Sequence, residues 1–142
     1  MYDLLKNNKR IFGLFDEFFS ELPQETKKYV SFKRPKVNVS EKESEFIVDV
    51  FYPGVKKENF KIQVEESILT ISSNFKDDDW DTANDNVFSQ EYTMYDFSRR
   101  FKIPKDVVIE KIGAVYENGV LAVKIPKDKK KEKERIKEIK IE

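Results

Sequence analysis

Carboxylates are the side chains of this sequence with the clearest potential for chemistry. Asp77, Asp79 and Asp81 alternate in an acidic loop, a spacing that resembles the first ligands of a calcium-binding loop. Such a loop also requires Gly at its sixth position and Glu at its twelfth. This chain has Thr82 and Phe88 at those positions. We therefore interpret the stretch as a solvated acidic loop and expect no metal.

The side chains on which most catalytic and metal sites depend are missing. The 142 residues include no Cys and no His, which excludes disulfide bonds, thiolate nucleophiles, imidazole acid–base chemistry and the usual zinc sites. The four Gly residues form no phosphate-binding loop. Paired carboxylates can support acid–base catalysis. An enzyme that uses the acidic loop is therefore an alternative. We expect a protein that is not an enzyme and holds no cofactor.

Charge and hydropathy indicate which partners the chain can bind and in which cellular compartment it is expected. The 27 Lys and Arg residues balance the 27 Asp and Glu residues, so the chain has no general attraction for nucleic acid. No apolar run approaches the roughly 20 residues that span a membrane. The N-terminus lacks a secretory signal pattern. Because the absence of Cys also fits a reducing compartment, we expect a cytoplasmic protein.

The elements that must position any functional residue are strands in the central segment of the chain. Apolar and polar residues alternate there with a period of two, which indicates half-buried strands. Asn118-Gly119 is a strong hairpin signal, because a type I′ turn needs positive φ at both central residues. Strands are expected at residues 35–39, 45–52, 60–64, 68–72, 97–103, 112–116 and 120–125, with residues 88–95 a candidate for one more. This series predicts an all-β, immunoglobulin-like sandwich of two facing sheets.

One predicted strand carries apolar residues on both faces. Phe46, Val48 and Val50 share one face of residues 45–52, and Ile47 and Phe51 lie on the other. Since successive side chains of a strand point to opposite faces, we expect burial on both sides of this strand.

Residues 1–33 are predicted to form a Phe-rich arm. Apolar residues at helical spacing predict a short amphipathic helix that stops before Pro23. Its apolar face includes Phe12, Phe15, Phe18 and Phe19. This face either packs on the core of the same chain or remains available to partner proteins. A membrane-surface helix is less favoured, because the polar face is mixed rather than rich in Lys and Arg.

Residues 128–142 are predicted to form a charged extension that ends in three isoleucines. Its first part is a linker that we expect to be flexible, and Ile136, Ile139 and Ile141 follow. Ile139 and Ile141 share a face in an extended strand, whereas Ile136 and Ile139 would share a face in a short helix. Apolar side chains at the end of a charged tail indicate docking, either on another copy or back onto the chain's own sandwich.

Several short motifs occur in a fixed order along the chain. They are Pro35–Val39, Tyr52-Pro53-Gly54-Val55, Leu69-Thr70-Ile71, Phe97–Pro104, Ala114–Leu121, Val123–Lys127 and Ile139-Lys140-Ile141. In the same order they resemble P-x-v-d-i, L-P-G-V, L-T-I, F-x-R-x-F-x-L-P, A-x-x-x-n-G-V-L, the L-P-K ending and the I-x-I motif of the small heat shock proteins, the α-crystallin (Hsp20) family. The resemblance covers residues 34–127 and extends to both flanks.

The resemblance implies an α-crystallin domain at residues 34–127 and an ATP-independent holdase chaperone. Such proteins form dimers, assemble into larger homo-oligomers, respond to stress and bind unfolding clients. ATP-dependent chaperones are a candidate further partner. The Phe residues of the arm (Phe12, Phe15, Phe18 and Phe19) are the expected contacts with clients.

The resemblance to the bacterial and plant type also implies the contacts of assembly. A strand at residues 86–91 would pair with the first domain strand of a partner. The implied dimer residues are Lys36, Val37, Asn38, Val39, Val87, Phe88, Ser89, Gln90, Glu91 and Arg99. Ile136, Ile139 and Ile141 would dock in an edge groove of a neighbour. That groove would be lined by Phe60, Ile62, Val64, Ile112, Ala114 and Tyr116.

Three positions depart from the family's pattern. The family often reads E-R-x-y-G-x-F before the Arg that corresponds to Arg99, whereas here Tyr92 follows Glu91 and Tyr95 replaces the Gly. Tyr52 also stands where the family has Leu in L-P-G-V. A phenol carries no charge to pair and adds bulk where Gly allows close approach. The departures therefore concern the loop and the dimer contact rather than the fold.

A co-chaperone of the p23 type, with a similar sandwich, is the alternative function. Such a protein docks on one dedicated partner, is expected to be monomeric, and needs neither the I-x-I tail nor the Phe-rich arm. Molecular mass in solution distinguishes it from an oligomeric holdase.

Overall fold

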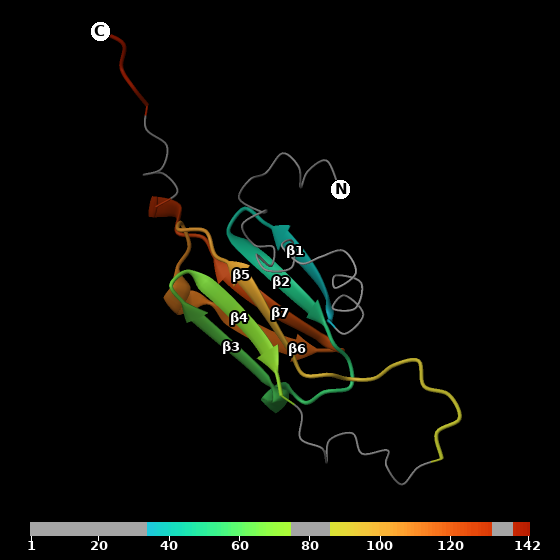
Figure 1. Ribbon diagram of the computed structural model, residues 1–142. Coiled ribbons are helices and arrows are strands. Elements are labelled where there is room, and N and C mark those ends of the chain that lie inside the picture. Colours follow the sequence, from blue (N-terminus) through green and yellow to red (C-terminus); the bar gives the residue numbers. More distant parts are fainter. Residues whose placement is uncertain (1–33, 75–85, 132–137) are drawn as a thin grey trace, which may run out of the picture.

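Two antiparallel sheets pack face to face in the computed structural model (Figure 1), which describes residues 34–74, 86–131 and 138–142. One sheet has the strand order β1-β2-β7-β6, and the other has the order β3-β4-β5. The strands are β1 (Lys36–Glu41), β2 (Glu45–Phe51), β3 (Phe60–Glu65), β4 (Ile68–Ser73), β5 (Phe97–Lys102), β6 (Gly113–Glu117) and β7 (Val120–Pro126). Two single turns of 3₁₀-helix, η1 (Lys57–Asn59) and η3 (Ile109–Lys111), precede β3 and β6. The predicted all-β sandwich is confirmed.

The core lies between the two sheets and follows the alternation of the sequence. In β2, Phe46, Val48 and Val50 are fully buried, and β4 contributes Leu69 and Ile71 from the opposite sheet. The remaining buried apolar residues of the central layer are Tyr52, Phe97, Phe101, Ile103, Val107, Leu121, Val123 and Ile125. Since burial of one such side chain stabilises a fold by roughly 1.5–3 kcal/mol, this layer is the main source of stability.

The outward face of β2 is only partly covered. Ile47 is buried, as expected, but Phe51 is 39% exposed. The prediction of burial on both faces is therefore wrong for Phe51. The reason is positional, because Phe51 is the last residue of β2 and its side chain lies on the face opposite to the buried Val50.

Two tight turns join neighbouring strands through residues with positive φ. Asn118 (φ 53°) and Gly119 (φ 77°) connect β6 to β7, which confirms the predicted type I′ hairpin. Glu66 (φ 48°) and Ser67 (φ 65°) make the same kind of connection between β3 and β4. Neither residue of this second turn is a usual choice for this conformation.

Residues 86–96 form no strand within the single chain. The extra strand expected at residues 88–95 is therefore absent from this structure. A strand needs a neighbour for its backbone N–H and C=O groups, and this segment runs out from the sheets instead of along one (Figure 1, yellow).

The start of the C-terminal extension is more ordered than expected. Lys129, Lys130 and Lys131 have helical backbone. Asp128 caps this turn, because its Oδ1 accepts hydrogen bonds from the backbone N–H groups of Lys130 (3.0 Å) and Lys131 (3.3 Å). A side-chain oxygen at this position satisfies N–H groups that have no partner inside the helix. The predicted linker therefore begins with one helical turn, and its residues 132–137 lie outside the described part of the chain.

Candidate functional site

The strand β1 leaves one edge of the four-stranded sheet open. It pairs with β2 on one side, and no strand of the described residues pairs with its other side. Val37 and Val39 pack against the core, whereas Lys36 and Asn38 are exposed. An open strand edge offers backbone N–H and C=O groups to another strand. The predicted dimer residues of β1 therefore lie where a further strand can add.

Arg99 joins the two sheets beside this edge. It lies in β5 on the inward face, between the buried Phe97 and Phe101. Its guanidinium carbon is 5.5 Å from the centre of the Phe101 ring, within range of a cation–π contact. Its Nη1 donates a hydrogen bond of 3.1 Å to the carbonyl of Pro35, just before β1. Arg99 thus has a structural role in the single chain, and its predicted role in a dimer stays a prediction.

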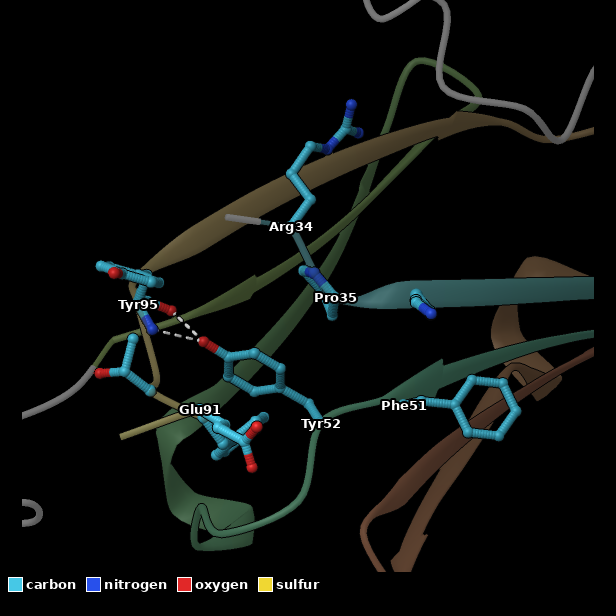
Figure 2. Close-up of a pocket in the computed structure, with 9 residues that line it drawn as sticks. Arg34, Pro35, Phe51, Tyr52, Glu91 and Tyr95 are labelled. Atoms are coloured by element: carbon cyan, nitrogen blue, oxygen red, sulfur yellow. Dashed lines mark hydrogen bonds between the residues drawn. The ribbon is translucent and has the colours of Figure 1, made fainter. Parts of the chain in front are cut away.

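Tyr52, at the end of β2, holds the base of the long loop. Its hydroxyl oxygen accepts a hydrogen bond from the backbone N–H of Tyr95 (2.6 Å) and also contacts the Tyr95 carbonyl (Figure 2). The ring makes an edge contact with Phe97, at 5.1 Å between centres. Tyr52 is only 5% exposed, and burial raises the pKa of its phenol to about 12. The phenol is therefore a neutral, fixed anchor at physiological pH.

Two more tyrosines strengthen the same junction. The Tyr92 hydroxyl donates a hydrogen bond of 2.7 Å to the carbonyl of Pro53, and burial raises the pKa of this phenol too. From β6, the Tyr116 hydroxyl donates a bond of 2.8 Å to the carbonyl of Tyr52. Loop, β2 and β6 are thus tied at one point by phenol groups. We call Tyr52, Tyr92, Tyr95 and Tyr116 the tyrosine cluster.

Three members of the tyrosine cluster are the residues at which the sequence departs from the motifs it resembles. Sequence reasoning treated Tyr52, Tyr92 and Tyr95 as separate departures and missed that they meet. The available signal was the appearance of Tyr at departures in two motifs that lie far apart in the sequence. The structure shows that the Tyr52 and Tyr92 hydroxyl groups each bond to the backbone of the other segment, whereas Tyr95 takes part through its backbone.

A pocket of about 260 Å³ opens beside the tyrosine cluster (Figure 2). Its lining comes from residues 34–36 before and in β1, from Phe51 and Tyr52 of β2 and its exit, and from residues 91–93 and Tyr95 of the loop. Sequence analysis names Lys36 and Glu91 as site residues but predicts no pocket. Its walls come from three distant segments, and no motif marks such a meeting point.

The loop segment at residues 86–91, which carries the other half of the predicted dimer contact, is exposed throughout. Phe88 is 98% exposed and Val87 is 49% exposed. Ser89, Gln90 and Glu91 complete the predicted set and are exposed as well. The segment forms no strand pairing with β1 of its own chain, although Glu91 at its end lines the same pocket as Lys36.

The other open edge of the sandwich brings β3 and β6 together. Each ends its sheet, and the rings of Phe60 and Tyr116 lie 4.9 Å apart between centres. Ala114 is exposed. The other five residues of the predicted groove are partly buried against the core: Phe60, Ile62, Val64, Ile112 and Tyr116. The structure thus places this set at one edge with apolar surface still accessible.

The isoleucines of the tail are exposed. Ile139 is 79% exposed and Ile141 is 94% exposed, so the structure lends no support to a return of the tail onto its own sandwich. Ile136 lies outside the described residues. So do Phe12, Phe15, Phe18 and Phe19 of the arm, and Asp77, Asp79 and Asp81 of the acidic loop.

The part of the chain that the structure describes contains no group of three or more acidic, His or Cys residues able to hold a metal ion. Within the same part, no helix has the length and apolar character needed to cross a membrane.

Comparison with known proteins shows which family the chain resembles over most of its length. The model of the Hsp20/alpha crystallin family matches residues 38–142. "Small heat shock protein C4" of Rickettsia felis is 31% identical over 131 residues, which are 90% of this chain and 78% of that protein. "16.9 kDa class I heat shock protein 1" of Triticum aestivum is 33% identical over 123 residues, which are 84% of this chain and 82% of that protein.

Solved structures agree with the sequence relatives. "Heat shock protein 16.0" from Schizosaccharomyces pombe superposes with a TM-score of 0.67 at 28% identity, and the match covers 96% of this chain and 99% of that one. A small heat-shock protein from Xylella fastidiosa, described as having a distinct high order structure, gives a TM-score of 0.59 at 26% identity. That match covers 66% of this chain and 84% of that one.

Proposed function

Because the chain belongs to the Hsp20/alpha crystallin family, we propose that it is an ATP-independent holdase chaperone. It binds unfolding proteins, prevents their aggregation, and assembles from dimers into larger homo-oligomers. The observation that carries the proposal is the coexistence of exposed tail isoleucines with a partly buried apolar edge at β3 and β6. Within the described part of a single chain, no other residues bury the tail isoleucines or complete the burial of this edge.

The tail supplies reversible links between dimers in this proposal. Burial of one Ile side chain contributes roughly 1.5–3 kcal/mol, and ordering of the tail offsets part of that gain. Ile139 and Ile141 in a groove of a neighbour thus make a weak contact. Many such contacts around an oligomer hold it together and still release under stress, because the linker raises the effective concentration without rigidity.

The dimer forms through strand addition in this proposal. Residues 86–91 of one copy pair with Lys36–Val39 of the other, and the open edge of β1 and the exposure of the segment support this pairing. Arg99 lies directly beside β1 through its bond to Pro35. Its position supports a role in fixing the orientation of the receiving strand.

Clients bind the Phe-rich arm of residues 1–33 in this proposal, with Phe12, Phe15, Phe18 and Phe19 as the contacts. The support is the sequence pattern, since these residues lie outside the described part of the structure. Held clients pass to ATP-dependent chaperones, and the absence of Cys supports a cytoplasmic place of action.

Mass measurement combined with a turbidity assay tests the function. The purified chain is examined by size-exclusion chromatography with light scattering, and a heat-labile enzyme is then heated with and without it in the absence of ATP. We expect oligomers larger than a dimer and a lower turbidity. A monomer that leaves turbidity unchanged would instead support the p23-like adaptor.

A further inference from the structure

We propose that the pocket beside the tyrosine cluster receives the Phe88 side chain of a second copy of this chain, and that the second copy receives Phe88 in return. This inference rests on the proposed dimer and specifies its central contact. The pocket, of about 260 Å³, has room for a phenyl ring, because an engineered apolar cavity of about 150 Å³ already binds benzene.

The walls of the pocket suit an aromatic side chain. Phe51, Tyr52, Tyr92 and Tyr95 are among the residues that line it, and aromatic pairs in tilted or edge-to-face contact are favourable beyond the area they bury. The hydrogen bonds from Tyr92 to Pro53 and between Tyr52 and Tyr95 fix these walls in the single chain. A pocket formed before binding loses less conformational freedom when it is filled.

Phe88 is the occupant that the distribution of exposed apolar side chains favours. It is 98% exposed, more than any other large apolar residue in the described part of the chain. Phe51 (39%) and Tyr92 (43%) are also exposed, and both line the pocket. Exposed apolar side chains thus occur both on the loop segment and at the pocket. Within the described part of a single chain, these side chains remain uncovered.

Symmetry explains how one chain carries both halves of the contact. In a two-fold dimer the same patch is used by both copies, so a donor residue and its receptor site must lie on one surface. Phe88 is four residues before Tyr92, a pocket residue, and four extended residues span at most about 14 Å. Donor and pocket are therefore close enough to belong to a single interface.

Position favours the same pairing. The pocket begins at residues 34–36, so it continues the open edge of β1 on which residues 86–91 are proposed to add. The charged lining of the pocket is mixed, since Arg34 and Lys36 lie there with Glu91 of the same chain. The donor segment, residues 86–91, contains no basic residue, so it brings no further positive charge to Arg34 and Lys36.

Photo-crosslinking of the full chain tests the contact directly. One preparation carries p-benzoylphenylalanine in place of Phe88, and it is mixed with ¹⁵N-labelled unmodified chain and irradiated. We expect labelled peptides that contain residues 34–36, 51–52 or 91–95 to be crosslinked to position 88. Crosslinks from position 88 to the tail, to the β3–β6 edge or to no labelled chain would overturn the proposal.

Matched substitutions provide a second measurement. Phe88→Ser is expected to speed exchange of subunits between labelled and unlabelled full-length protein by about tenfold or more, as the loss of one buried aromatic contact predicts. Val87→Ser, at the neighbouring exposed residue, should change the rate less than about threefold. Thr93→Trp, which fills the pocket, should reproduce the effect of Phe88→Ser, and the two changes together should not add.

The outcomes separate this inference from the proposed function. Circular dichroism of each variant should show an unchanged sandwich, since Phe88 is almost fully exposed. If the unmodified chain forms no dimer, the proposed assembly fails. If dimers form and suppress client aggregation but Phe88→Ser and Val87→Ser exchange alike, only the role of Phe88 fails.

Discussion

Tyr52 connects more of this molecule than any one sequence motif indicates. Its ring packs against Phe97 in the core, and its backbone N–H donates to the carbonyl of Gly119 at 2.8 Å. Its hydroxyl group bonds to the backbone of Tyr95 in the loop. A Leu at this position, as in the family motif, would fill the core but could make no such bond. The side chain therefore converts a packing position into a link between sandwich and loop.

Replacement of single tyrosines should show that a buried hydrogen bond contributes more to the free energy of unfolding than an exposed one. Tyr52→Phe leaves the N–H of Tyr95 without its partner, and we expect a loss of about 1–3 kcal/mol in the free energy of unfolding. Tyr92→Phe removes an exposed bond that water can replace, so its loss should be about 0.5 kcal/mol. Urea unfolding followed by circular dichroism measures both, and equal losses would contradict the assigned roles.

The raised pKa of Tyr52 predicts a loss of stability in alkali. The pKa of this phenol is about 12 in the folded chain, against an ordinary value of 10.0. Between these values the unfolded chain releases a proton that the folded chain keeps, so stability falls as pH rises from 10 towards 12. Tyr52→Phe should show a smaller fall over this range in urea unfolding. Parallel curves for the variant and the unmodified chain would exclude Tyr52 as the cause.

At the scale of elements, the β6–β7 hairpin holds Tyr116 of β6 beside Tyr52 at the end of β2. Its type I′ turn places Gly119 against the turn that follows β2, where an added Cβ would lie 3.0 Å from the Cβ of Pro53. The same turn holds Tyr116 and the exit of β2 in contact. The glycine is thus required both by its φ and by the close approach of Pro53.

Gly119→Ala should destabilise the chain by more than about 1 kcal/mol, because Ala is strained at positive φ. Gly113→Ala is a matched control, since a Cβ at that position meets no atom within 4 Å. We expect the control to be neutral or slightly stabilising, because Ala has less freedom than Gly to lose on folding. Thermal unfolding of the two variants checks the pair, and a similar melting temperature for both would be inconsistent with this reading.

The tail is the second element with a testable role. The double change Ile139→Ala with Ile141→Ala should leave folded dimers and abolish larger assemblies, because the two exposed anchors are lost. Ending the chain before Ile136 should act in the same way. Lys140→Ala, between the two anchors, should keep the full oligomer mass. Light scattering measures the oligomer mass of each variant. A tail variant with the mass of the unmodified chain would show that the tail has no role in assembly.

At the scale of the whole molecule, the sandwich carries apolar segments that lie outside its core. The loop segment and the tail extend beyond the sheets (Figure 1), and both present exposed apolar side chains. The described core needs neither for its own packing. In the proposed function, assembly and client binding can therefore change without unfolding the sandwich.

The arm provides the prediction at this scale. Changing Phe15, Phe18 and Phe19 to Ser should weaken suppression of client turbidity severalfold, because the proposed client contacts are apolar. The circular dichroism spectrum of the sandwich should remain the same. As a control, Lys9 and Arg10 of the same arm are changed to Ser, and suppression should stay near that of the unmodified chain. Full suppression by the Phe variant would remove these residues from the client site.

Each observed strand lies within two residues of a predicted one. This agreement has a local cause, because alternation such as Phe46-Ile47-Val48 and turn residues such as Asn118-Gly119 act over a few neighbours. Phe51 and residues 88–95 were predicted less well. Whether they are buried or paired depends on what lies across from them, and the sequence of one segment does not contain that information.

The sequence by itself determined the strands, the type I′ hairpin, the inward faces of the sheets and the family, since these follow from periodicity, turn chemistry and ordered motifs. Only the tertiary structure decided that Tyr52, Tyr92 and Tyr95 meet, that a pocket forms between them and the start of β1, and that Phe88 stands free of its own sandwich. Those features join segments some 40 residues apart in the chain. Contacts at that separation arise from the packing of sheets, which no local pattern encodes.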